Sequence, residues 1–235
     1  MQPSDVPFFI ARRSFFSRVA AGLAAFGAAA RADAAAFTPG APEGGWQAAR
    51  HAEDDWLDKI PGKHRTILDA VSAAGVGGAL HFASNIFETS KSGYGLESAD
   101  VAVVICLRHG ATAFAYNDAM WSKYGAALSA RAKFDDPKSH QPAVVNVYNS
   151  TEYQGVLSNG AATFDAMIKS GVHFAVCDHS THGYAGGLAR AASAKAEEVY
   201  KELTSHLIGS AHMVPSGIVA VGHAQERGYA YAYCG

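Results

Sequence analysis

One short segment concentrates side chains that can do chemistry. Residues 177–182, with the sequence CDHSTH, hold one thiol, one carboxylate and two imidazoles. Cys177 ends an apolar run and a helical pattern follows it, so its thiol should face the N–H groups and positive dipole end of a helix. Such surroundings favour the thiolate, the reactive form of cysteine. The alternative is that Cys177 is a small buried core residue, as free cysteines often are.

The same segment also suggests a metal site. Cys177, His179 and His182 carry donor atoms that zinc or copper would accept. The spacing matches no strong metal motif, and a complete site would need a further ligand such as His109. A positively charged imidazole of His179 or His182 would equally favour the thiolate. The thiol and metal interpretations both stay open, and the sequence makes no cofactor certain.

The other two cysteines have different surroundings. Cys106 lies inside the continuous apolar run of residues 101–107, where we expect a core position. Cys234, one residue from the C-terminus, could act as a resolving thiol for Cys177, or pair with it if their strands are neighbours. Three cysteines cannot all pair within one chain, so a disulfide framework is excluded and the core must supply the stability.

The elements that position these residues alternate between strand and helix. Apolar and β-branched runs predict strands at residues 64–71, 101–107, 172–177, 213–215 and 229–233. Helical patterns lie after a glycine turn at 75–78, at 111–124, before Gly171, from 178 to about 208 and at 218–227. This alternation predicts a three-layer α/β domain, a mainly parallel sheet with helices on both faces, of the Rossmann or flavodoxin type.

Ligands of such sheets bind at the carboxyl ends of the strands. His109 and Cys177 lie at or just beyond predicted strand ends, and this position favours a functional role for both. The polar stretch from Arg131 to Asn149 predicts either a minor strand or part of a lid. The glycine turn at 75–78 lacks the complete G-x-G-x-x-G spacing, so nucleotide binding is disfavoured.

The composition is that of one globular domain. Of 235 residues, 49% are hydrophobic and 17% are charged, which excludes a disordered chain or a membrane bundle. The formal net charge is −2, with the two signs mixed along the chain. Because there is no basic stripe to neutralise phosphates, we expect no nucleic-acid partner.

The N-terminus carries a targeting pattern. Arg12 and Arg13 precede the sequence SFF and a weakly apolar run that is rich in alanine and glycine, and residues 30–32 (ARA) offer a cleavage site. We predict a twin-arginine signal peptide at 1–32, an irregular arm at 33–62 and one domain at 63–235. The protein is then expected to be periplasmic or secreted, with no stable membrane insertion after cleavage, because the apolar run is too short.

The predicted domain resembles the DsrE-like (DsrE/DsrF/DsrH-like) family over most of its length. The matching pieces are the first strand with its helix at 80–86, the strand ending in RHG (108–110), the strand ending in Cys177, VPSGIV (214–219) and QERGYAY (225–231). The last piece is the most distinctive. The export signal, the segment before His64, the insertion at 131–159 and the histidines after Cys177 depart from the family pattern.

The resemblance implies a sulfur-handling function. In sulfur-relay members, the cysteine at the place of Cys177 accepts and passes on a sulfane sulfur as a persulfide. We therefore expect a sulfur-carrier or thiol-relay protein rather than a classical enzyme, with His109 and either His179 or His182 tuning the thiolate. Its partners would be a sulfur donor or acceptor protein or a small thiol, and it would form a homo-oligomer. The alternatives are a non-catalytic periplasmic metal- or haem-binding protein and a structural or interaction subunit, since the fold alone does no chemistry.

Overall fold

A five-stranded sheet forms the centre of the described chain. The computed structural model describes residues 47–235, so the predicted signal peptide and the first part of the arm lie outside the described residues. The strands are β1 (His64–Ala70), β2 (Val101–Leu107), β3 (His173–Cys177), β4 (Ala211–Val214) and β5 (Ala230–Cys234). They pair in the order β4-β3-β2-β1-β5, and every pairing is parallel. All five predicted strands are confirmed, with small shifts at their ends.

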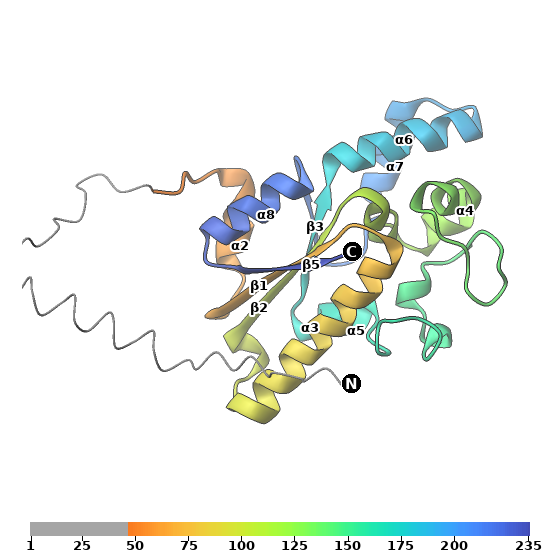
Figure 1. Cartoon of the computed structure of the whole chain (residues 1–235). Helices are drawn as coiled ribbons and strands as arrows, with labels where there is room; N and C mark the ends of the chain where they lie inside the picture. The colour runs from red at the N-terminus through yellow and green to blue at the C-terminus, as the bar shows by residue number, and fades with distance from the viewer. Residues whose placement is uncertain (1–46) are drawn as a thin grey trace, which may run out of the picture. The chain divides into compact units, whose positions relative to one another are not determined.

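Helices cover both faces of this sheet (Figure 1). They are α2 (Asp55–Lys59), α3 (Ala73–Tyr94), α4 (Asp118–Ala132), α5 (Phe164–Ser170), α6 (Asp178–Ala192), α7 (Ala196–Ser205) and α8 (Gly217–Glu226). The chain steps from β1 to β4 in one direction and then returns to β5 at the other edge. Because parallel crossovers are right-handed, this reversal places α8 on the opposite face from α3 to α7. The predicted three-layer α/β architecture is confirmed.

The central strand β2 shows why one run of the sequence is apolar without a break. All seven of its residues are buried. Val103, Ile105 and Leu107 face the core shared with α3 to α7, whereas Val104 and Cys106 face a smaller core under α2 and α8. A strand that is covered on both faces has no side on which polar residues can alternate.

The glycines after β1 lie inside a helix, so the predicted turn at 75–78 is wrong. Ser72 caps α3 by accepting a hydrogen bond from the N–H of Gly75 at 3.0 Å. A Cβ atom on Gly75 would collide with the carbonyl oxygen of Cys234 at the end of β5. The glycine is therefore needed for close approach of two backbones, which is the other common use of this residue.

Two predicted helices have different limits in the structure. A 3-10 helix (His109–Ala115) occupies the start of the region predicted at 111–124, and α4 follows its cap residue Asn117. The helix predicted from 178 to about 208 is divided into α6 and α7 after Ser193, whose φ is +52°. A left-handed residue ends a helix, and α7 then packs against α6.

The stretch from Arg131 to Asn149 contains no strand, so the minor strand suggested there is wrong. Side-chain hydrogen bonds hold this stretch in place. The Nδ2 atom of Asn146 donates to the carbonyl oxygens of Phe114 and Tyr116 at 2.9 and 3.0 Å. An amide that satisfies two buried carbonyl groups replaces the ladder that a strand would form.

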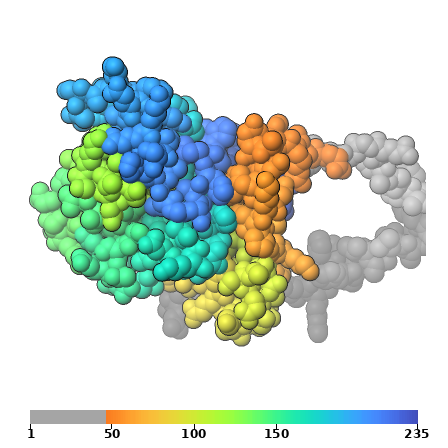
Figure 2. Space-filling view, turned by 180° about the vertical axis from the view of Figure 1, so that it is seen from behind, coloured from red at the N-terminus to blue at the C-terminus, as the bar shows by residue number. Residues whose placement is uncertain are grey.

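Part of the arm that was predicted to be irregular is helical. Leu57 of α2 is buried in the core under α8, and its carbonyl oxygen accepts bonds from the Tyr229 hydroxyl at 2.7 Å and from Nη1 of Arg65 at 2.9 Å. Figure 2 shows this N-terminal part of the described chain in orange. It therefore packs as part of the domain. Within residues 47–235, no helix combines the length and apolar character needed to cross a membrane.

Candidate functional site

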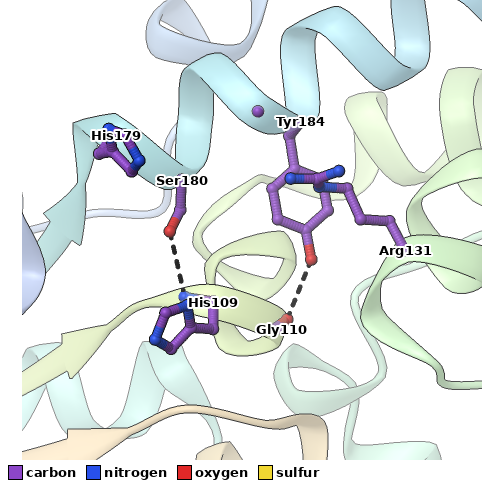
Figure 3. A pocket seen from close by; sticks show the side chains of 7 residues that line it. His109, Gly110, Arg131, His179, Ser180 and Tyr184 are labelled. Atoms are coloured by element: carbon purple, nitrogen blue, oxygen red, sulfur yellow. Dashed lines mark hydrogen bonds between the residues drawn. The ribbon is translucent and has the colours of Figure 1, made fainter.

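A cavity of about 440 Å³ opens at the carboxyl edge of the sheet, beyond the ends of β2 and β3 (Figure 3). It is lined by His109, Gly110, Arg131, His179, Ser180, Gly183 and Tyr184. These residues come from the segment after β2, the last turn of α4 and the first turns of α6. Ligands of parallel sheets typically bind at this edge. We call this cavity the arginine pocket.

Cys177 lies beside the arginine pocket without lining it. It is the N-cap of α6, and its Sγ atom accepts a hydrogen bond from the N–H of Ser180 at 3.4 Å. Its carbonyl oxygen accepts a second bond from the Thr181 hydroxyl at 3.0 Å. Only 4% of the residue is exposed. The sulfur thus contacts a helix N-terminus, as the reactive-thiol interpretation requires, and is also buried, as the core interpretation requires.

Two of the predicted histidines reach the arginine pocket. His109 has φ of +52°, a conformation that residues other than glycine seldom adopt, and its N–H donates to Oγ of Ser180 at 3.1 Å. The N–H of His179 donates to the carbonyl oxygen of Pro215 at 3.3 Å. These two bonds join the segments that follow β2, β3 and β4, and both histidines form part of the pocket wall (Figure 3).

His182 lies outside the arginine pocket. Its ring stacks on Tyr200 of α7 with the centroids 4.1 Å apart, and its Nε2 atom lies 3.5 Å from the carboxylate of Asp178. The Tyr200 hydroxyl donates to the same carboxylate at 2.6 Å, and this bond raises the pKa of Tyr200 to about 12. The three side chains join α6 to α7. The proposed tuning of Cys177 by His182 stays a prediction.

The predicted metal ligands do not gather into a site. Among residues 47–235, no three His, Cys, Asp or Glu side chains form a group that could hold a metal ion. The thiol of Cys177 is directed to a backbone N–H, His179 lies at the arginine pocket, and His182 packs on α7. The zinc or copper alternative therefore finds no ligand set in this part of the chain.

The sequence did not identify Arg131, Gly183 or Tyr184 as residues of the pocket. The guanidinium of Arg131 lies over the ring of Tyr184, 4.7 Å from the centroid. The hydroxyl of Tyr184 donates to the carbonyl oxygen of Gly110 at 3.2 Å, and burial raises the pKa of this tyrosine. An arginine in the last turn of a helix is normally explained by the helix dipole alone. Only the contact between α4 and α6 identifies Arg131 as a pocket residue.

A second cavity of about 390 Å³ adjoins the arginine pocket at the carboxyl end of β1. It is lined by Val71, Ser72, Ala73, Ala74, Gly110, Arg131, Ala132 and Lys133. Gly110 and Arg131 line both cavities. Of the described residues that line either cavity, none is acidic.

The three cysteines are separate thiols in the described chain. Cys177 ends β3 and Cys234 ends β5, with β2 and β1 between them. Neighbouring strands lie about 4.8 Å apart, so these residues are roughly 14 Å apart, well beyond the reach of a disulfide. The suggested pairing of Cys177 with Cys234 is therefore wrong. Burial strongly raises the pKa of Cys106, whose Sγ donates to the carbonyl oxygen of Gly217 at 3.5 Å.

The fold and the pocket define the protein as a three-layer, flavodoxin-like α/β domain with a cavity at the carboxyl edge of its parallel sheet. Comparisons with protein families, with curated proteins and with solved structures find no match to this chain. A fold of this kind hosts many functions, so the chemistry of the site has to define what the protein does.

Proposed function

We propose that this chain is an exported DsrE-like protein that carries sulfur on Cys177 and relays it between a donor and an acceptor. One observation carries the proposal. The sulfur atom of Cys177 caps α6 and accepts the N–H of Ser180 at 3.4 Å. A helix N-terminus stabilises negative charge on a sulfur atom through its dipole and its unpaired N–H groups.

The position of Cys177 also suits a relay. The two residues that line the arginine pocket from the first turn of α6, His179 and Ser180, follow Cys177 within three positions. A donor bound in the pocket would therefore contact the turn of α6 that directly follows the thiol. Because the thiol is buried, transfer requires a local movement of the turn.

The transfer itself needs no cofactor and no oxidant. The Cys177 thiolate attacks the terminal sulfur of a donor persulfide, and a new S–S bond forms as the S–S bond of the donor breaks. The donor leaves as a thiolate. An acceptor thiolate then repeats the exchange at the persulfide of Cys177, so one sulfur atom moves with no net oxidation. The partners of this proposal are a donor or acceptor protein or a small thiol, and the carrier is a periplasmic or secreted homo-oligomer.

Intact mass spectrometry of the exported protein tests the proposal. After incubation with a small-molecule persulfide, the mass should rise by about 32 Da for each sulfur atom carried as a persulfide. Peptide mapping should place the added sulfur on Cys177. The Cys177→Ser variant should lose the addition, and Cys234→Ser, which removes a cysteine at another strand end, should keep it.

One outcome would contradict the sulfur-carrier function. If Cys177 takes up sulfur only after denaturation in urea, it is a core residue and the carrier function is wrong. The remaining functions would then be ligand binding at the cavities or a structural role as a subunit.

A further inference from the structure

The arginine pocket and the adjoining cavity collect positive charge without a countercharge. Arg131 and Lys133 line these cavities together with His109 and His179, and none of the described residues that line them is acidic. The whole chain has a formal net charge of −2. The local excess of cations therefore belongs to the pocket and not to a generally basic protein.

Two glycines of α6, Gly183 and Gly187, leave space for the side chain of Arg131 in the pocket. A Cβ atom on Gly183 would collide with Nη2 of Arg131, and a Cβ atom on Gly187 would lie 4.0 Å from its Nη1. Glycine inside a helix is destabilising relative to alanine. Gly183 has a reason to be there, because it leaves the space that the guanidinium occupies.

A second arginine, Arg190, also approaches Gly187. The Nη2 atom of Arg190 also lies 4.0 Å from the position that a Cβ atom on Gly187 would take. Neither Arg131 nor Arg190 forms an ion pair with a carboxylate among residues 47–235. Both guanidinium groups thus approach Gly187, and an anion placed between them would be attracted by both charges.

The guanidinium of Arg131, an exposed side chain, packs on an aromatic ring. The ring of Tyr184 lies against one of its faces, 4.7 Å from centroid to Cζ, and the hydroxyl of Tyr184 is itself tied to Gly110. Figure 3 shows Arg131 and Tyr184 together on one side of the pocket, across from His109 and His179. The N–H edge of an arginine that stacks on a ring can donate two parallel hydrogen bonds to an oxyanion.

We infer that the arginine pocket binds the anionic group of a small organic molecule, a phosphate, sulfonate or carboxylate, through Arg131 with added charge from Arg190. The volume of about 440 Å³ is in the range of small-molecule sites and leaves space beside the anion for the rest of the ligand. The second cavity continues this space past Gly110. The inference does not depend on sulfur transfer, since Cys177 lines neither cavity.

Calorimetric titration of the full chain with sodium phosphate, sodium sulfate and sodium acetate, at constant ionic strength set with chloride, tests the inference. At least one of these anions should bind, and Arg131→Ala should weaken its binding by roughly tenfold or more, since a charged hydrogen-bond donor is lost. Gly183→Ala keeps every charge and favours the helix, so its thermal stability should not fall. It should nevertheless weaken binding, because its methyl group displaces the guanidinium of Arg131.

Two controls separate this site from other effects. Arg50→Ala removes the same charge from an arginine that pairs with Asp58 and lines neither cavity, and it should bind as the wild type does. Cys177→Ser should also bind normally, so a failure of the sulfur carrier and a failure of the anion site are distinguishable. Binding of phosphate and sulfate without acetate would identify a tetrahedral anion, and binding of acetate alone would identify a carboxylate. Absence of binding by all three anions, or equal binding by wild type and Arg131→Ala, would overturn the inference.

Discussion

The carboxylate of Asp69 and the guanidinium of Arg108 form a two-point ion pair at the carboxyl ends of β1 and β2. The Nε atom of Arg108 lies 2.7 Å from Oδ1 and its Nη2 atom lies 2.9 Å from Oδ2. The side chain of Asp69 is 0% exposed and that of Arg108 is 15% exposed. The bond to Asp69 raises the pKa of Arg108, and Tyr231 of β5 donates to Oδ2 at 3.1 Å. One buried carboxylate thus connects three neighbouring strands.

Removing the guanidinium of Arg108 should destabilise the folded domain. Arg108→Ala leaves the Asp69 carboxylate buried and uncompensated, so we expect the free energy of unfolding to fall by about 3–5 kcal/mol. Urea denaturation measures the loss. Arg50→Ala breaks an ion pair whose side chains are 53% and 48% exposed, and it should cost about 0–1 kcal/mol. Similar losses in the two variants would mean that the buried pair contributes no more than a surface pair.

The core of the central strand provides a second test of stability. Ile105 is fully buried between β2 and the helices of the larger core. Ile105→Ala should lower the free energy of unfolding by roughly 2–5 kcal/mol, because it removes apolar contacts and leaves a cavity. Val144 is exposed, so Val144→Ala should change stability by less than about 0.5 kcal/mol. A loss that small at Ile105 would contradict the position of β2 in the centre of the sheet.

The central strands β2 and β3 were predictable from the sequence because they are buried on both faces. In β2 this burial requires an apolar residue at every position, and a continuous run is visible without any knowledge of partners. The glycine at position 75 was not interpretable in the same way. Glycine permits a turn or a close approach, and here the deciding neighbour is the carbonyl oxygen of Cys234, at the far end of the chain.

The site was predictable only in part, for a related reason. Cys177 and His109 were identified because they lie at or just beyond strand ends, and the carboxyl edge of a parallel sheet collects such residues. Arg131 lies on α4 and acquires its place in the pocket from Tyr184 and Gly183 on α6. The sequence around Arg131 gives no sign of this contact between α4 and α6. The same holds for Asp69, whose partner Arg108 is the residue directly after β2.

A pair of histidines should make the stability of the domain depend on pH. The Nδ1 atom of His173 lies 3.0 Å from Nε2 of His212, and Trp56 of α2 stacks on His212 with the centroids 4.0 Å apart. Burial lowers the pKa of both imidazoles below the usual value of about 6.5, and the nearby His173 lowers that of His212 further. The unfolded chain therefore binds protons that the folded chain excludes, so stability should fall as the pH drops through about 6.5.

Urea midpoints at about pH 7.5 and pH 5.5 measure this dependence. The wild type should lose stability between the two conditions, and a variant with both His173→Gln and His212→Gln should lose less. His64→Gln replaces an exposed histidine and serves as the control. An unchanged difference between the two pH values in the double variant would show that other groups cause the dependence.

The N-terminal pair Arg12 and Arg13 leads to a prediction about export. We propose that Arg12 and Arg13 are the address read by the twin-arginine machinery, so replacing both with Lys should leave the precursor in the cytoplasm. Cell fractionation followed by mass measurement locates the protein and its cleavage site. Arg18→Lys changes an arginine outside the pair, and this variant should be exported normally. Efficient secretion of the double variant would show that another route is used.

The three cysteines should differ in their rates of alkylation in the folded protein. Cys106 is fully buried, and burial together with the nearby Asp69 carboxylate raises its pKa. Burial also raises the pKa of Cys234, to about 11. The sulfur of Cys177 instead lies at the N-terminus of α6 and accepts a hydrogen bond from the N–H of Ser180, and a thiolate at such a position is the nucleophile that displaces iodide from iodoacetamide. We therefore expect labelling at mildly acidic pH to modify Cys177 first, Cys234 later and Cys106 last.

Peptide mapping of briefly labelled protein measures this order, and the same labelling in urea should remove it, because unfolding exposes all three thiols equally. The variant His109→Ala takes an imidazole from the wall of the arginine pocket beside Cys177. It should slow the labelling of Cys177 without abolishing it, since the hydrogen bond from Ser180 remains. Slow labelling of all three cysteines in the native state, with rapid labelling in urea, would instead identify Cys177 as a core residue.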